Sequence, residues 1–94
     1  MRALETFHHT FSAAGTHTFD LGKKPREVLL KNMTSGTIKF SFGDAIDTEN
    51  DSYSQLPKGM FESINHIVWD DSANMHATIQ AEEAGDVEIR ILDY

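Results

Sequence analysis

An acidic segment near the middle of the chain carries carboxylates at a spacing that could bind calcium. Asp47, Glu49 and Asp51 place a carboxylate at every second position, as the first half of a calcium-binding loop does. The match ends there, because such a loop needs glycine at its sixth position and glutamate at its twelfth, where this chain has Ser52 and Lys58. We therefore expect a solvated loop, with these three carboxylates as a weak candidate metal site and no bound cofactor.

Five histidines are the other possible metal ligands. His8 and His9 are adjacent, so on a strand they point to opposite faces and cannot chelate one ion together. His17, His66 and His76 fall in separate predicted strands, and nothing in their spacing brings them together. Because histidine titrates near neutral pH, these residues favour a pH-sensitive contact over a metal site.

Signatures of catalysis are missing from the sequence. It has no Gly-x-Ser-x-Gly elbow, no His-Glu-x-x-His pair and no glycine-rich phosphate loop. It also has no cysteine, which excludes disulfides, thiolate zinc sites and thiol catalysis. We expect a protein that is not an enzyme.

Aromatic residues offer two kinds of binding surface. Trp69, Phe61 and Tyr53 could form a platform on which a sugar stacks, although Trp69 alternates in phase with Ile67 and is therefore better explained as a core residue. A carbohydrate-binding module remains an alternative, and it requires these rings to be exposed.

The two ends of the chain supply candidate residues for a subunit interface. Leu92 and Tyr94 are out of phase with the apolar residues that precede them, so they could lie on an exposed face. Phe7 and Phe11 share one face of the first predicted strand. We expect these four residues to contact a neighbouring subunit.

Composition limits the partners of this chain. Its 94 residues, of which 39% are hydrophobic, suffice for one small core and predict a single domain over residues 1–94. Fifteen acidic and eight basic residues give a net charge of −7, which argues against nucleic acid and anionic lipid as partners. There is no run of 18 apolar residues, and the first residues lack the order of a secretory signal.

Alternation of apolar and polar residues with period two runs through most of the chain and predicts β-strands. Ile38, Phe40 and Phe42 point to one side of a strand, whereas a helix would scatter them around its axis. Residues 28–30 are apolar on both faces and predict a central strand that is covered on both sides. Further alternating segments are residues 7–11, 16–21, 66–70, 75–81 and 86–94.

Turn-forming residues separate these segments. Residues 34–36 and 83–85 each end in glycine and predict hairpin connections, as do residues 71–74. Leu-Pro-Lys-Gly at 56–59 predicts a β-turn. We expect an all-β fold, namely an antiparallel, jelly-roll-like β-sandwich of seven to eight short strands, because two packed sheets bury the apolar faces that one sheet would leave in water.

The strands and turns predicted in residues 18–94 follow one another in a characteristic order. The elements are Val-Leu-Leu-Lys-Asn at 28–32, Ser-Gly at 35–36, Phe-Ser-Phe-Gly at 40–43, Leu-Pro-Lys-Gly-Met at 56–60, Trp69, and Gly-Asp-Val-Glu-Ile at 85–89. This layout resembles that of small β-sandwich structural proteins of tailed bacteriophages.

The resemblance implies a virion structural protein, above all a capsid decoration or cement protein that stabilises the shell through subunit contacts. A tail or head–tail connector subunit is the alternative within the same class. The implied partners are the major capsid protein and further copies of this chain, for instance in a trimer, and the implied location is the virion, assembled in the bacterial cytoplasm. Residues 1–17 precede the resemblance and are expected to form an added strand or an inter-subunit arm.

Overall fold

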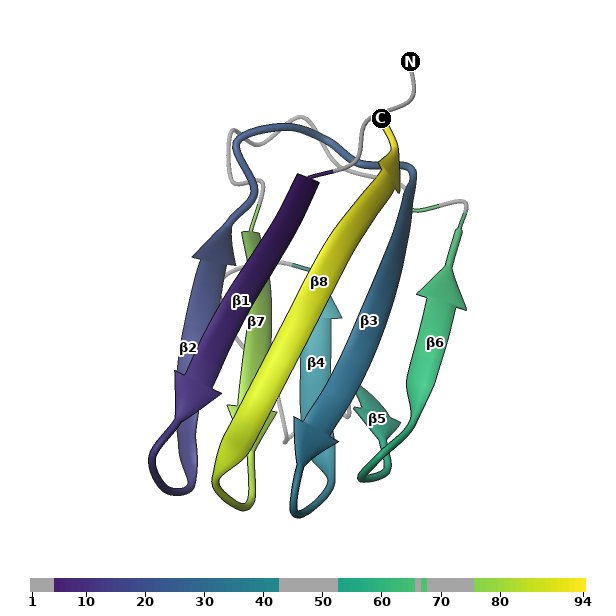
Figure 1. Ribbon diagram of the computed structural model, residues 1–94. Coiled ribbons are helices and arrows are strands. Elements are labelled where there is room, and N and C mark those ends of the chain that lie inside the picture. The colour runs from purple at the N-terminus through teal and green to yellow at the C-terminus, as the bar shows by residue number, and fades with distance from the viewer. Residues whose placement is uncertain (1–4, 43–52, 66, 68–75) are drawn as a thin grey trace.

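In the part of the chain that the computed structural model describes, eight antiparallel strands form two four-stranded sheets (Figure 1). The structure describes residues 5–42, 53–65, 67 and 76–94. In chain order the strands are β1 (Glu5–Phe11), β2 (Gly15–Asp20), β3 (Glu27–Thr34), β4 (Ile38–Phe42), β5 (Ser54–Leu56), β6 (Phe61–Ile64), β7 (His76–Ala81) and β8 (Gly85–Asp93). The expected antiparallel β-sandwich is confirmed.

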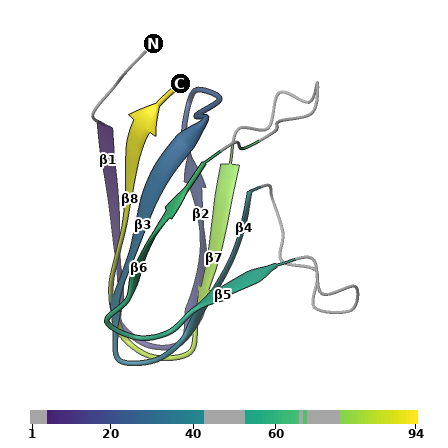
Figure 2. The same ribbon diagram turned by 90° about the vertical axis from the view of Figure 1, so that its right-hand side faces the viewer.

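The strands are ordered β1-β8-β3-β6 in one sheet, named sheet A, and β2-β7-β4-β5 in the other, named sheet B. The first strand therefore pairs with the last, the second with the seventh, the third with the sixth and the fourth with the fifth. This is the order of a long antiparallel ribbon that is folded over its own core, which is the jelly-roll topology. The two layers are seen edge-on in Figure 2.

The tight turns do not form the hairpins that we expected. At one end of the sandwich, the turns β1–β2, β3–β4, β5–β6 and β7–β8 each carry the chain from one sheet to the other (Figures 1 and 2). The hairpins predicted at residues 34–36 and 83–85 are therefore wrong, and the one at 71–74 lies outside the described residues. Glycine permits a tight turn whether the two strands it joins pair in one sheet or lie in opposite sheets. Here the two strands lie in opposite sheets, because that arrangement buries their apolar faces against each other across the core.

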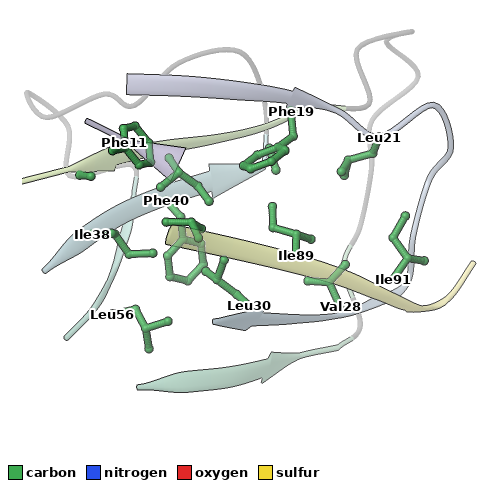
Figure 3. Close-up of a cluster of buried hydrophobic side chains, with 14 residues drawn as sticks. Phe11, Phe19, Leu21, Val28, Leu30, Ile38, Phe40, Leu56, Ile89 and Ile91 are labelled. Carbon is green, nitrogen blue, oxygen red and sulfur yellow. The ribbon is translucent and has the colours of Figure 1, made fainter. Parts of the chain in front are cut away.

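The core lies between the sheets and contains most of the described residues that the alternation assigned to the inward faces, with Phe7 and Phe42 partly buried against it (Figure 3). Ile38, Val28 and Ile79 have no exposed surface, and Phe40 is 7% exposed. At roughly 1.5–3 kcal/mol for each large apolar side chain, this burial is the main term that opposes the loss of chain entropy. The buried apolar side chains are Phe11, Phe19, Leu21, Val28, Leu30, Ile38, Phe40, Leu56, Ala77, Ile79, Ala81, Val87, Ile89 and Ile91.

The outer face of β3 is only partly covered by the residues that the structure describes. Leu29 lies in register with Arg90 on one side and Ser63 on the other, and it is half-exposed. Met33, on the same face, is 51% exposed. β3 is a central strand of sheet A, between β8 and β6, as residues 28–30 predicted, and Leu29 on its outer face is partly buried.

Asn32 is the polar centre of the end at which the tight turns lie. Its side chain is 1% exposed, and its amide nitrogen donates hydrogen bonds to the carbonyl oxygens of Gly36 and Leu56, both at 2.9 Å. Its side-chain oxygen accepts hydrogen bonds from the backbone N–H of Thr34 at 3.0 Å and from the Thr34 hydroxyl at 2.6 Å. One buried amide thus links the β3–β4 turn to the end of β5.

Gly85 is required where β8 begins beside β3. Its φ of +136° is strained for any residue with a side chain, and a Cβ there would lie 2.5 Å from the Thr34 Cα. Because that neighbour is backbone, it cannot rotate away. Gly22 also has a positive φ, of +70°, but nothing lies within 4 Å of the place a Cβ would take.

We expect Gly85→Ala to destabilise the protein by about 3 kcal/mol, because backbone strain and overpacking act together. Gly22→Ala is the matched control, since it introduces the strain without the collision, and it should cost about 1 kcal/mol. Urea unfolding followed by circular dichroism measures both values. Equal losses in the two variants would show that the contact with β3 does not constrain Gly85.

We expect Asn32→Asp to lower the free energy of unfolding by about 3 kcal/mol, because an aspartate of the same size cannot donate to the two carbonyls and brings a charge into a buried site. Thr34→Val, which removes one hydroxyl of the same network, should cost only about 1 kcal/mol. Chemical denaturation at neutral pH compares them. A neutral effect of Asn32→Asp would contradict the role given to this amide.

Candidate functional site: the outer face of sheet A

The register of sheet A places charged and apolar side chains in continuous rows on its outer face. One row crosses all four strands, and a second row runs beside it. The first row is His8, Glu88, Lys31 and Phe61, and the second is Thr6, Arg90, Leu29 and Ser63, on β1, β8, β3 and β6 in that order. Residues two apart on a strand share a face, so these eight side chains belong to one surface.

Glu88 is the centre of the charged part of this surface. Its side chain is only 8% exposed and lies 3.5 Å from the Lys31 Nζ and 3.1 Å from an Arg90 nitrogen that donates a hydrogen bond to it. Burial acts to raise the pKa of Glu88, but the Arg90 hydrogen bond and the charges of Lys31, Arg90 and His8 outweigh it, so the pKa lies below its ordinary value. We name Lys31, Glu88 and Arg90 the ion ladder.

Three exposed hydrophobic side chains lie at the β6 side of the ion ladder. Phe61, opposite Lys31, is 68% exposed, while Met33 and Met60 are 51% and 53% exposed. Met60 is held beside β3 because its carbonyl oxygen accepts a hydrogen bond from the Asn32 N–H. We name Met33, Met60 and Phe61 the apolar patch. β6 is an edge strand of sheet A, and exposed apolar groups at a sheet edge typically mark a contact with another molecule.

The four residues expected at an interface do not share one exposed surface. Phe11 is 5% exposed and belongs to the core, and Phe7 is partly buried against it, with its ring edge-on to Phe19 at 6.4 Å. Tyr94 also packs against the core, and Leu92 is half-exposed.

The residues proposed for other sites are dispersed or lie outside the described ranges. Asp47, Glu49 and Asp51 are outside them, as is Trp69. Within the described residues, no group of three or more His, Asp or Glu could hold a metal ion. Phe61 and Tyr53 belong to different sheets and do not share one face: Phe61 faces outward from sheet A, and Tyr53 precedes the edge strand of sheet B.

No helix in the described part of the chain is long and apolar enough to cross a membrane.

Two histidines that the sequence did not connect meet at the opposite edge of the sandwich. His9 on β1 and His17 on β2 stack with ring centroids 3.7 Å apart and planes 8° apart, which joins the edge of sheet A to the edge of sheet B. Phe11 and Phe19 approach them edge-on. Burial, and then the charge of His9, lower the pKa of His17. His8 points to the outer face, as expected for adjacent strand residues.

The stacked pair predicts that stability falls on mild acidification. Because the pKa of His17 is lower in the folded protein than in the unfolded chain, the unfolded chain binds more protons just below pH 6.5, and stability is lost as the pH falls through that range. His17→Phe keeps a ring in the stack and removes this titration. Melting temperatures between pH 7.5 and 5.5 should fall by several degrees less in the variant than in the parent protein. A parallel fall in both would place the acid sensitivity elsewhere.

Known proteins give no direct indication of the function of this chain. The chain matches no protein-family model, and comparisons with curated proteins and with solved structures find no match. The fold defines a small jelly-roll β-sandwich, and sheet A gives it a surface that combines an ion ladder with an apolar patch.

Proposed function

We propose that the protein is a virion structural protein of a tailed bacteriophage, a decoration or cement subunit that binds the major capsid protein through the outer face of sheet A. The observation that carries the proposal is the apolar patch of Met33, Met60 and Phe61, which come from β3, from the turn before β6 and from the edge strand β6, on an acidic, cysteine-free chain. Large hydrophobic side chains exposed together on a small protein typically serve contact with another protein.

The outer face of sheet A is suited to bind another protein, because the apolar patch can supply affinity and the ion ladder can fix the orientation of the partner. Aromatic and methionine side chains such as Phe61 and Met33 are the residue types that anchor protein interfaces. The ion ladder beside them holds Lys31 and Arg90 at fixed positions around the nearly buried Glu88 carboxylate, which favours one orientation of a charged partner.

A cement subunit needs a rigid body more than a strong single contact. Many symmetric copies act together on a shell, so each copy stabilises the shell by its binding free energy even where that energy is small. The jelly roll provides rigidity, since its sheets are joined by four tight turns at one end. Assembly into homo-oligomers, such as trimers on the capsid surface, and location in the virion belong to the same proposal. A tail or connector subunit would use the same surface.

Replacing the apolar patch tests this function. We expect Met33→Ser combined with Phe61→Ser to weaken binding to expanded capsids of the phage that carries the gene by at least tenfold, because buried anchors of this kind dominate interface energies. Both side chains are exposed, so the fold should persist. Co-sedimentation with purified capsids measures the binding.

Gln80→Ser is the matched control, since Gln80 is exposed on β7 of sheet B, away from the apolar patch. It should bind as the parent protein does. Failure of the parent protein to bind either capsids or purified tails would overturn the proposed function, and unchanged binding by the double variant would remove sheet A from it.

A further inference from the structure

A groove opens between β5 and β6, on the side of the sandwich opposite the stacked histidines. These strands are the edges of sheets B and A, and they diverge after the turn that joins them (Figure 2). The groove has a volume of about 420 Å³. Small-molecule sites typically have volumes of roughly 300–1,000 Å³, so the space suits one or two sugar rings.

The floor of the groove is aromatic and fixed by the core. Phe40 and Phe42 of β4 lie there, with ring centroids 6.4 Å apart at an interplanar angle of 79°. Phe40 is 7% exposed and pairs in register with Ile79, whereas Phe42 is half-buried, so the deeper ring supports the more accessible one. Tyr53 adds a third ring, and the Lys39 Nζ lies 5.0 Å from its centroid.

The rim of the groove is polar and comes from both edge strands. Ser54 is in register with Phe40, and Glu62 is in register with Leu30, so both occupy positions that face the interior of the sandwich. They are nevertheless exposed, because the groove opens at this point. Among the described residues, no ion pair engages the Glu62 carboxylate.

We propose that this groove binds a neutral carbohydrate, at the scale of a monosaccharide or disaccharide. The apolar face of a sugar ring packs against aromatic rings such as Phe42 and Tyr53, while its hydroxyl groups donate hydrogen bonds to the Glu62 carboxylate and exchange them with Ser54. Each of these contacts uses a group that the groove presents.

The charge of the groove selects against other ligands. Its described lining contains one carboxylate and no lysine or arginine, although the Lys39 ammonium lies over one face of the Tyr53 ring. Because the chain has a net charge of −7 and Glu62 is at the rim, phosphates and acidic sugars are disfavoured. A single carboxylate also gives a cationic peptide little to bind, whereas the combination of rings, hydroxyls and one acceptor fits a neutral polyol.

The sugar site is separate from the docking surface on sheet A. Phe61 and Glu62 are neighbours on β6 and point to opposite faces, so Phe61 belongs to the apolar patch and Glu62 to the groove. A capsid subunit could therefore bind its shell and a sugar at the same time, and each proposal can fail without the other.

Titration of the isotope-labelled protein with glucose, galactose, mannose and N-acetylglucosamine tests the site by nuclear magnetic resonance. We expect at least one of them to shift the amide signals of Ser41, Tyr53, Ser54 and Glu62 in a saturable manner. Glu62→Gln should weaken that binding about tenfold, because it removes a charged hydrogen-bond acceptor. Glu83→Gln, the same charge change in the β7–β8 turn, should leave it unchanged.

Two results would overturn the proposal. One is the absence of saturable shifts at the groove with all four sugars. The other is binding of a lysine-containing peptide that depends on Glu62 in the absence of sugar binding, which would make the groove a site for cations. The spectrum of Glu62→Gln without sugar should match that of the parent protein except near residue 62. This control shows that weaker binding by the variant does not result from a loss of fold.

Discussion

Mutual burial of two apolar sheet faces is the interaction on which the whole structure depends. Neighbouring strands in the sequence lie in opposite sheets at every tight turn, and among the strands that the structure describes only β4 and β5 are consecutive in the chain and paired in one sheet. Neither sheet can therefore form without the other, because its strands are connected through its partner. Such a topology has few local pairings, which makes its folding cooperative and slow relative to a meander of hairpins.

Buried polar groups determine the register of the strands, which hydrophobic burial alone does not fully specify. Hydrophobic burial excludes a one-residue slip, which would turn the apolar faces to solvent, but it distinguishes less sharply between registers two residues apart. Asn32 makes that choice at the end where the tight turns lie, because its amide can reach the Gly36 and Leu56 carbonyls only when β3, β4 and β5 are correctly placed. Glu88 acts in the same way on the outer face, where its contact with Lys31 requires the observed pairing of β3 and β8, while Arg90 on its own strand holds the carboxylate in place.

The sandwich presents three different surfaces from a single core. Sheet A offers charge beside exposed hydrophobic groups, the β1–β2 edge is joined by stacked imidazoles, and the β5–β6 edge opens into an aromatic groove. The two edges differ because β1 and β2 are held together by ring contacts, whereas β5 and β6 diverge after their turn. The proposed contact with a large partner and the proposed sugar site therefore lie on different faces.

Local apolar patterning was enough to predict six of the eight described strands, inward residues such as Ile38 and Ile89, and the sandwich class, because alternation is a local property of a strand with one apolar face. It did not predict β5 or β6, which are short and largely exposed. Only the tertiary structure decided which strands pair. It turned the expected hairpin at residues 34–36 into a crossing between sheets, moved Phe11 from a possible interface into the core, and brought His9 to His17 and Met33 to Phe61. These residues come from strands that are distant in the sequence. Which of these strands lie side by side depends on the packing of the whole core, and no local spacing in the sequence encodes that choice.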